Sequence, residues 1–327
     1  MRFKKIIIIN LTLFFYLILN TINCANATLF KIKLLILVGQ SNMVGYGSNM
    51  DSLPRNLKET QTAIWYDKNN KWTKLEAPTE PLPFSGGIPQ NIGFGSEISL
   101  AHELSEQLKQ PIAIVKYARN STSLTEDWKP GSTLYNNMIQ RVKTSIDDFD
   151  LSQSNLPIAV LEISGFFWLQ GEADAKYPIS ANQYQENLIN LIQNIRRDLN
   201  SPNLPIIIGK IPIQNNQKTT FGVNGFFPYA ETVRQAQSNV TQILPNTTTV
   251  ETIDLPRTQD NLHLNSQGLI NLGERFGQQW LTLYLSRNHP EISSSTIQEY
   301  SRIRKSESTL GRSSIPREGT AIAHNHK

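Results

Sequence analysis

Cysteine is nearly absent from this sequence, and charged residues are fewer than in an average protein. The chain of 327 residues contains one cysteine, Cys24, and Asp, Glu, Lys and Arg together make up 18% of it. A single cysteine excludes an internal disulfide framework and a zinc site built from several thiolates. The net charge of +4 comes from the two ends of the chain, because acidic residues slightly outnumber basic ones between residues 28 and 285. That stretch has neither a run of Lys and Arg nor aromatic residues interleaved with them, so no nucleic-acid partner is expected.

Histidine and phosphate-binding glycine motifs are scarce as well. Between residues 28 and 285 the histidines are His102, inside a helical pattern, and His263, in a polar loop. Neither has another histidine nearby at the spacing of a metal site. The first apolar run is followed by no Walker or dinucleotide motif, and a nucleophile elbow G-x-S-x-G is absent because Met43 stands where its second glycine would be. We therefore expect no metal and no cofactor.

The amino-terminal end has the three regions of a secretory signal. Lys4 and Lys5 precede an apolar stretch, residues 6–19, and the small residues Ala25 and Ala27 follow it. A signal needs roughly 7–15 apolar residues, whereas a membrane-spanning helix needs roughly 20. We therefore predict a signal peptide over residues 1–27 and an exported protein, secreted or periplasmic, with no stable membrane span after cleavage. The alternative is an uncleaved segment that anchors the protein in the membrane.

The carboxyl-terminal end differs in composition from the rest of the chain. Residues 286–327 are rich in Ser, Arg and Glu and almost free of aromatic side chains. Such a composition cannot bury a core and favours a disordered polar tail. The folded domain is then expected over residues 28–285, which is long enough to stabilise itself through its own core.

Short apolar runs alternate with amphipathic helical patterns through the body of the chain. Near-continuous apolarity is typical of strands that are buried on both faces. The alternation of strands and helices predicts an α/β fold with a parallel sheet of five strands between two layers of helices. The expected strands are Ile32–Val38, Ile112–Tyr117, Ala159–Trp168, Ile206–Ile211 and Thr248–Ile253, and the expected helices are Ser96–Lys109, Leu134–Ile146, Asn182–Leu199, Tyr229–Gln242 and Ser266–Leu285.

Three loops at predicted strand ends carry reactive side chains. Ser41 follows the first strand, where the N–H groups of a helix start would stabilise negative charge, although it could simply cap that helix. After the third strand, Gln170 could donate to an oxyanion and Glu172 could orient neighbours or serve as an acid. After the fifth strand, Asp260 can reach Nδ1–H of His263 and leave Nε2 as a base. Ligands of parallel sheets bind beyond the carboxyl ends of the strands, so these loops should meet at one edge.

Aromatic residues gather in a long segment between the first and second predicted strands. Trp65, Tyr66 and Trp72 lie there, and Trp128 follows the second strand. These rings could stack on sugars, but the packing of a long loop explains each of them equally well. Their location alone leaves both interpretations open.

Three of these stretches together resemble a known family. They are similar to sequence blocks of the SGNH-hydrolase superfamily, and more closely to its carbohydrate esterase family 6 and sialate O-acetylesterase (SASA) branch. The segment 93–97 is similar to the family's glycine block, and 116–122 to a further stretch, in which relatives usually have two glycines where this chain has Asn120 and Ser121. The likeness spans roughly residues 34–268. The three stretches are Gly39-Gln40-Ser41-Asn42-Met43, Gln170-Gly171-Glu172-Ala173-Asp174 and Asp260-Asn261-Leu262-His263.

The resemblance implies a flavodoxin-like α/β/α sandwich and an acyl-serine mechanism. By position, Ser41 corresponds to the nucleophile, His263 to the base and Asp260 to the acid that orients it. The implied oxyanion donors are the backbone N–H groups of Ser41 and Gly95 and the side chain of Gln170. Residues that could bind substrate or support the site are Gln40, Asn120 and Glu172.

The function predicted in this way is that of an exported serine esterase. Its substrate would be an O-acetylated carbohydrate, either acetylxylan-type polysaccharide or O-acetylated sialic acid. A catalytically silent carbohydrate-binding protein on the same fold is one alternative, because fold alone does not imply activity. A lipase or thioesterase of the same superfamily is another, although the sequence has no obvious amphipathic lid helix.

Overall fold

The computed structural model describes residues 30–58, 63–79, 93–149, 159–213 and 227–288. The predicted signal peptide, residues 1–27, lies outside the described residues, as does the predicted tail from residue 289 onward. Residues 286–288 belong to the last helix, which continues beyond the predicted end of the domain at residue 285. Within these ranges no helix is both long enough and apolar enough to cross a membrane.

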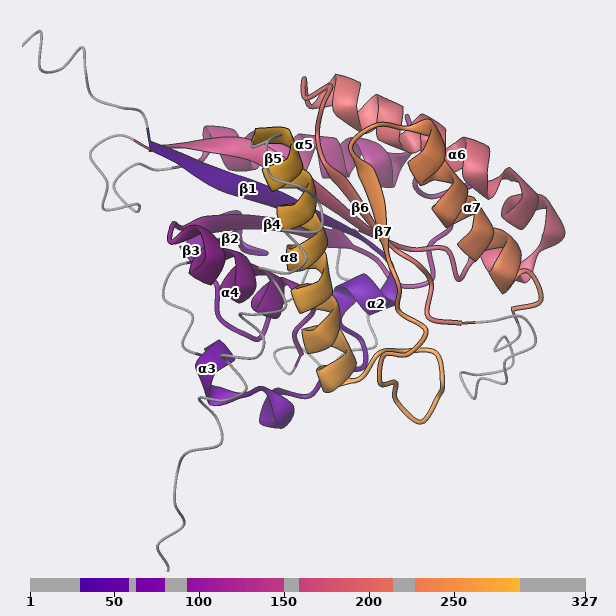
Figure 1. The fold of residues 1–327 in the computed structure, drawn as a ribbon, viewed down its shortest axis with the longest axis horizontal. Helices are drawn as coiled ribbons and strands as arrows, with labels where there is room; N and C mark the ends of the chain where they lie inside the picture. The colour runs from indigo at the N-terminus through magenta and orange to yellow at the C-terminus, as the bar shows by residue number, and fades with distance from the viewer. Residues whose placement is uncertain (1–29, 59–62, 80–92, 150–158, 214–226, 289–327) are drawn as a thin grey trace, which may run out of the picture.

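A seven-stranded sheet forms the centre of the molecule, in the order β3-β2-β4-β1-β5-β6-β7 (Figure 1). Neighbouring strands are parallel except β2 and β3, which pair antiparallel. β1 lies in the middle, and its side chains from Leu34 to Val38 are fully buried, which explains its unbroken apolar sequence. The strands are β1 (Phe30–Gly39), β2 (Ala63–Tyr66), β3 (Trp72–Lys74), β4 (Ile112–Ala118), β5 (Ala159–Leu169), β6 (Ile206–Gly209) and β7 (Thr247–Val250).

Helices cover both faces of the sheet (Figure 1). Apolar side chains of α5, α6 and α7 pack on one face, and those of α4 and α8 pack on the other together with the short helices α2 and α3. The helices are α2 (Ser41–Val44), α3 (Arg55–Lys58), α4 (Glu97–Leu108), α5 (Thr133–Asp147), α6 (Pro178–Asp198), α7 (Ala230–Ile243) and α8 (Ser266–Asn288), with 3-10 turns at Met50–Ser52 and Asp174–Lys176.

The predicted α/β/α fold class is confirmed, but the predicted number of strands is wrong. All five expected strands and all five expected helices are present, with ends that differ by a few residues. The two additional strands, β2 and β3, form a short hairpin at the edge of the sheet, beside β4. They lie in the segment that was expected to be a loop, and they are too short to produce a long apolar run.

The aromatic residues of this hairpin are buried against the rest of the protein. Trp65, Tyr66 and Trp72 are 7%, 0% and 3% exposed, and Trp128 is fully buried. Nε1–H of Trp72 donates to the carbonyl of Ser145 in α5, at 2.7 Å. Stacking of these rings on a sugar is therefore wrong for this structure, and the packing interpretation holds.

Candidate active site

Ser41, His263 and Asp260 meet at the carboxyl-terminal edge of the sheet. Nε2 of His263 lies 2.9 Å from Oγ of Ser41, and Nδ1 of the same ring lies 2.6 Å from Oδ2 of Asp260. Ser41 starts α2 directly after β1, whereas Asp260 and His263 lie in the loop between β7 and α8. Two segments separated by more than two hundred residues thus form one continuous chain of polar contacts. A hydroxyl, an imidazole and a carboxylate in this order can form an activated nucleophile.

The backbone around Ser41 is held by the neighbouring strand. Gln40 donates its N–H to the carbonyl of Leu169 at the end of β5, at 3.0 Å. A Cβ on Gly39 would lie 2.1 Å from that same carbonyl oxygen, so only glycine fits there. Ser41 is the first residue of α2, and its N–H finds no acceptor within the described part of the chain. This N–H is therefore available to an oxyanion beside Oγ.

His263 is buried between a carboxylate and an aromatic ring. Its exposure is 1%, and the ring of Tyr46 lies over it with centroids 4.5 Å apart. Burial lowers the pKa of His263 below its usual 6.5, although Asp260 opposes this change. Burial would raise the pKa of Asp260, but hydrogen bonds from Thr258 and His263 keep it below its usual value. At neutral pH the pair is a neutral imidazole beside a carboxylate, which is the protonation state that a general base requires.

Gly95 does not match its predicted role as an oxyanion donor. Its N–H donates to Oε1 of Glu97, at 2.7 Å. Oε2 of Glu97 lies 2.9 Å from Nζ of Lys116, and both side chains are fully buried. Lys116 also donates to the carbonyl of Val44, the last residue of α2, at 3.0 Å. The segment around Gly95 is thus part of an ion-paired support beneath α2, and its N–H is already used.

Gln170 also does not match its predicted role. Its Nε2 donates to the carbonyl of Thr122 at 2.8 Å and to Oδ2 of Asp174 at 2.6 Å, and its side chain is fully buried. Asp174 accepts in addition from the backbone N–H groups of Leu124 and Thr125. Both N–H groups of the Gln170 amide are therefore committed to holding the loop after β4 in place.

The remaining predicted residues also lie at this edge. Oε1 of Gln40 is 3.4 Å from the N–H of Gly171 and 3.5 Å from that of Ala173, so this side chain supports the loop after β5. Asn120 is half-buried in the turn after β4, next to Ser121, whose φ is 59°. A left-handed φ favours glycine, so Ser121 occupies a backbone position that a glycine would fill more easily. The turn lies beside Ser41, because Arg119 donates its N–H to the carbonyl of Gly39 at 3.1 Å.

Asn42, which sequence reasoning missed, connects the nucleophile's helix to the histidine. Its Oδ1 accepts from the N–H of Leu264 at 2.8 Å, and its Nδ2 lies 3.4 Å from the carbonyl of Leu262. Nδ2 also donates to Oε1 of Glu172 at 2.8 Å. Glu172 is 2% exposed, and burial raises its pKa to about 7. The position of Asn42 directly after Ser41 is the only sequence signal that could have identified it.

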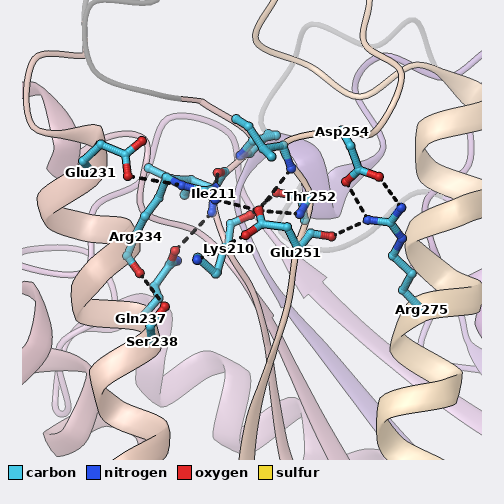
Figure 2. Close-up of polar contacts among 12 residues, drawn as sticks. Lys210, Ile211, Glu231, Arg234, Gln237, Ser238, Glu251, Thr252, Asp254 and Arg275 are labelled. Carbon is cyan, nitrogen blue, oxygen red and sulfur yellow. Dashed lines mark hydrogen bonds and ion pairs between the residues drawn. The ribbon is translucent and has the colours of Figure 1, made fainter. Parts of the chain in front are cut away.

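Arginines from two helices hold the start of the loop that carries Asp260 and His263. Figure 2 shows Arg234 of α7 and Arg275 of α8 on either side of the end of β7. Nη2 of Arg234 contacts Glu251 at 2.6 Å, and Arg275 forms a two-pronged pair with Asp254 at 2.8 and 2.6 Å. Lys210 at the end of β6 adds a contact to Glu251 at 3.2 Å. These charged contacts tie the residues that follow β7 to α7, α8 and the end of β6.

The described parts of the chain contain no cluster of side chains that could bind a metal ion. Nowhere in those ranges do three His, Cys, Asp or Glu side chains gather as metal ligands would. The contacts at the edge of the sheet join a hydroxyl, an imidazole and a carboxylate in one continuous chain. The fold and this edge together define a carboxylic ester hydrolase of the α/β/α type.

Comparison with known proteins identifies the family. The chain belongs to the SASA family of carbohydrate esterases, described as sialic acid-specific acetylesterases, whose model matches residues 31–282. A probable carbohydrate esterase of Arabidopsis thaliana is 29% identical over 264 residues, which cover 76% of this chain and 90% of the relative. The resemblance predicted from the three sequence stretches is confirmed.

Solved structures agree with this assignment. The X-ray structure of the Arabidopsis thaliana protein superposes with a TM-score of 0.63 at 28% identity and covers 76% of this chain and 98% of its own. NanS superposes with a TM-score of 0.57 at 16% identity, over 78% of this chain and 98% of its own. A carbohydrate acetylesterase from Xanthomonas citri gives 0.50 at 17% identity, over 75% and 55%. The last two likenesses concern the fold alone.

Proposed function

We propose that this protein is a serine esterase that removes O-acetyl groups from carbohydrates through an acyl-enzyme on Ser41. The observation that carries the proposal is the unbroken contact from Ser41 through His263 to Asp260. Membership of a carbohydrate acetylesterase family supports the acetyl group and the sugar as the two halves of the ester. Acetylated xylan and O-acetylated sialic acid are the two substrate classes to compare.

The reaction follows from the positions of the three groups. Oγ of Ser41 attacks the acetyl carbonyl carbon while its proton passes to Nε2 of His263. The carbon–oxygen bond to the sugar then breaks, and His263 returns the proton to the leaving sugar oxygen. In the second half, water attacks the acetyl-serine, His263 again takes and returns a proton, and acetate leaves. Asp260 keeps Nδ1 protonated and stabilises the imidazolium that forms in each half.

The N–H of Ser41 is the donor that the described structure leaves open to the oxyanion. Removing one well-placed donor typically costs about 2.7–4 kcal/mol of transition-state stabilisation. Further donation would come from the turn after β4 that contains Asn120, because this turn lies beside the end of β1. This assignment replaces the predicted donors Gly95 and Gln170, whose N–H groups are engaged elsewhere.

Export belongs to the same proposal. A basic, apolar and small-residue sequence over residues 1–27 supports a secreted or periplasmic enzyme. Export would place the enzyme where polymeric or cell-surface carbohydrates occur. Amino-terminal sequencing of the protein recovered outside the cytoplasm should begin close to residue 28, and a chain that keeps residue 1 would contradict cleavage.

The decisive experiment is acetate release from acetylated xylan, O-acetylated sialic acid and simple acetylated sugars. Ser41→Ala should reduce turnover by several orders of magnitude and leave the far-UV circular dichroism unchanged. Ser286→Ala is the matched control, because that hydroxyl is exposed at the far end of α8. Turnover of Ser41→Ala close to that of the parent would remove Ser41 from the mechanism. Faster hydrolysis of long-chain than of acetyl esters would indicate a lipase instead.

A further inference from the structure

The amide of Asn42 has all the contacts that fix a side chain in one orientation. Its oxygen accepts from the N–H of Leu264, and its nitrogen faces two acceptors, the carbonyl of Leu262 and Oε1 of Glu172. If the amide were turned over, oxygen would face oxygen at Leu262 and Glu172, and nitrogen would face an N–H at Leu264. All three contacts therefore agree on one orientation. Asn42 is 1% exposed, so water does not compete for these bonds.

The residues that Asn42 holds are those directly before and after His263. Leu262 and Leu264 flank the histidine, and Asn42 itself directly follows Ser41. The side chain of Asn42 thus connects the helix that begins with Ser41 to both neighbours of His263. Because the peptide geometry is stiff, fixing both neighbours restricts where His263 can place its ring.

Glu172 supports this bridge from a third segment, the loop after β5. Its Oε1 accepts from Asn42, and its Oε2 has no hydrogen-bond partner within the described residues. Accepting through Oε1 requires neither a negative charge nor a particular proton on Oε2. Glu172 is therefore suited to orienting the amide whether it is ionised or neutral.

We propose that Asn42 and Glu172 form a positioning clamp that holds His263 within reach of Ser41. The inference rests on the proposed function, because it explains how the esterase keeps its base in place. Neither residue touches the reacting atoms, and both act through the backbone on either side of His263. Loss of the clamp should lower kcat and leave KM nearly unchanged, because substrate contacts are not altered.

The first test compares Asn42→Ala with a matched control. A misplacement of the base by about 1 Å can cost roughly 10²-fold in rate, so kcat for acetate release should fall by about that factor. Asn49→Ala is the control, because Asn49 is exposed and its side chain, among the described residues, bonds within its own turn, to the N–H of Asp51. A kcat for Asn42→Ala within twofold of the parent would overturn the clamp.

A second pair of variants keeps the test valid if Asn42→Ala does not fold. Asn42→Asp has the same shape but turns an oxygen toward Oε1 of Glu172, so kcat should fall by at least tenfold. Adding Glu172→Gln to Asn42→Asp supplies an amide donor opposite the new carboxylate and should recover much of that loss. Additive losses in the double variant would contradict a direct coupling between the two side chains.

A histidine titration by NMR separates the clamp from the proposed function. Among the described residues, Asp260 of the same loop contacts the ring of His263 and the ring of Tyr46 packs against it, while Glu172 is linked to the histidine through Asn42. A loosened ring gains water, so the pKa of His263 should rise towards 6.5 in Asn42→Ala and stay at the parental value in Asn49→Ala. An unchanged titration in both variants would overturn the clamp. A parent that hydrolyses no acetyl ester would instead refute the proposed function.

Discussion

Asp260 binds His263 twice, once through the backbone and once through the ring. Oδ1 of Asp260 accepts from the N–H of His263 at 2.9 Å, and Oδ2 lies 2.6 Å from Nδ1. The three-residue spacing makes this possible, because a tight loop brings the carboxylate back beneath the residue that it orients. A single side chain therefore sets both the path of the loop and the tautomer of the base.

Asp260→Asn should preserve the conformation of the loop but abolish most of the esterase activity. The amide oxygen can still accept from the backbone, but the amide nitrogen would face Nδ1 and favour the wrong tautomer of His263. We expect kcat to fall by about 10⁴. Steady-state acetate release together with a thermal melt checks this result. A far greater loss in Glu172→Gln than in Asp260→Asn would mean that the acid has been misassigned, and a loss matched by unfolding would contradict the expectation that the loop is kept.

The pH profile should report the burial of His263. The ring must be neutral to accept the proton of Ser41, so protonation of His263 lowers activity. Because burial lowers the pKa of His263, the acidic limb of kcat/KM should have its midpoint below 6.5. Initial rates between pH 4 and 8 on a neutral acetylated sugar provide the measurement. A profile that stays flat down to about pH 4 would exclude a histidine base.

Lys116 should be essential to stability, because it neutralises Glu97 in a fully buried pair. Lys116→Met leaves a carboxylate without its cation, which typically costs about 3–5 kcal/mol of unfolding free energy. Lys116→Met combined with Glu97→Gln should recover a large part of that loss. Lys31→Met is the surface control, because Lys31 is 57% exposed in its pair with Glu162 and should cost at most about 1 kcal/mol. Urea unfolding of the parent and the three variants measures these differences. Equal losses of unfolding free energy in Lys116→Met and Lys31→Met would contradict a special contribution of the buried pair to stability.

Glu172 should make the protein less stable as the pH rises. Burial raises its folded pKa to about 7, above the usual 4.5, so the folded state binds more protons than the unfolded state between these values. The stability that this carboxyl contributes is therefore present below about pH 4.5 and is lost as the pH rises through about 7, up to about 3 kcal/mol.

Glu172→Gln removes the titrating group and should flatten that part of the stability curve. Urea unfolding at pH 5 and pH 7.5 gives the difference for the parent and for the variant. Glu126→Gln is the control, because Glu126 is 73% exposed on the surface. A parent and a Glu172→Gln variant with the same pH dependence would show that Glu172 stays ionised.

The sequence predicts the sheet well because its core strands are buried on both faces. Continuous apolar runs at β1, β4 and β5 are typical of such strands, and most of their residues are buried in the structure. The β2–β3 hairpin was not predicted because its strands are four and three residues long, which is too short to show a recognisable hydrophobic pattern. Its Trp and Tyr residues belong to the core rather than to a sugar-binding surface.

The residues of the candidate site that could be predicted are those whose type and position after a strand both point to the same chemistry. Ser41, Asp260 and His263 can be chosen from their place after strands, and the structure brings them together. Whether an N–H group is free to donate to an oxyanion could not be predicted in this way, because it depends on which other acceptors the same group contacts. The N–H of Gly95 donates to Glu97, and the amide of Gln170 donates to Thr122 and Asp174. These acceptors come from the tertiary packing, which the sequence does not reveal.

The contact between Ser41 and His263 joins the first strand to the segment that follows the last one. Six of the seven described strands precede α7, but without the loop that follows β7 Ser41 would have no contact with the base that we propose for it. Proteolytic removal of α8 together with the loop before it would therefore abolish the proposed hydrolysis while leaving Ser41 itself in the chain.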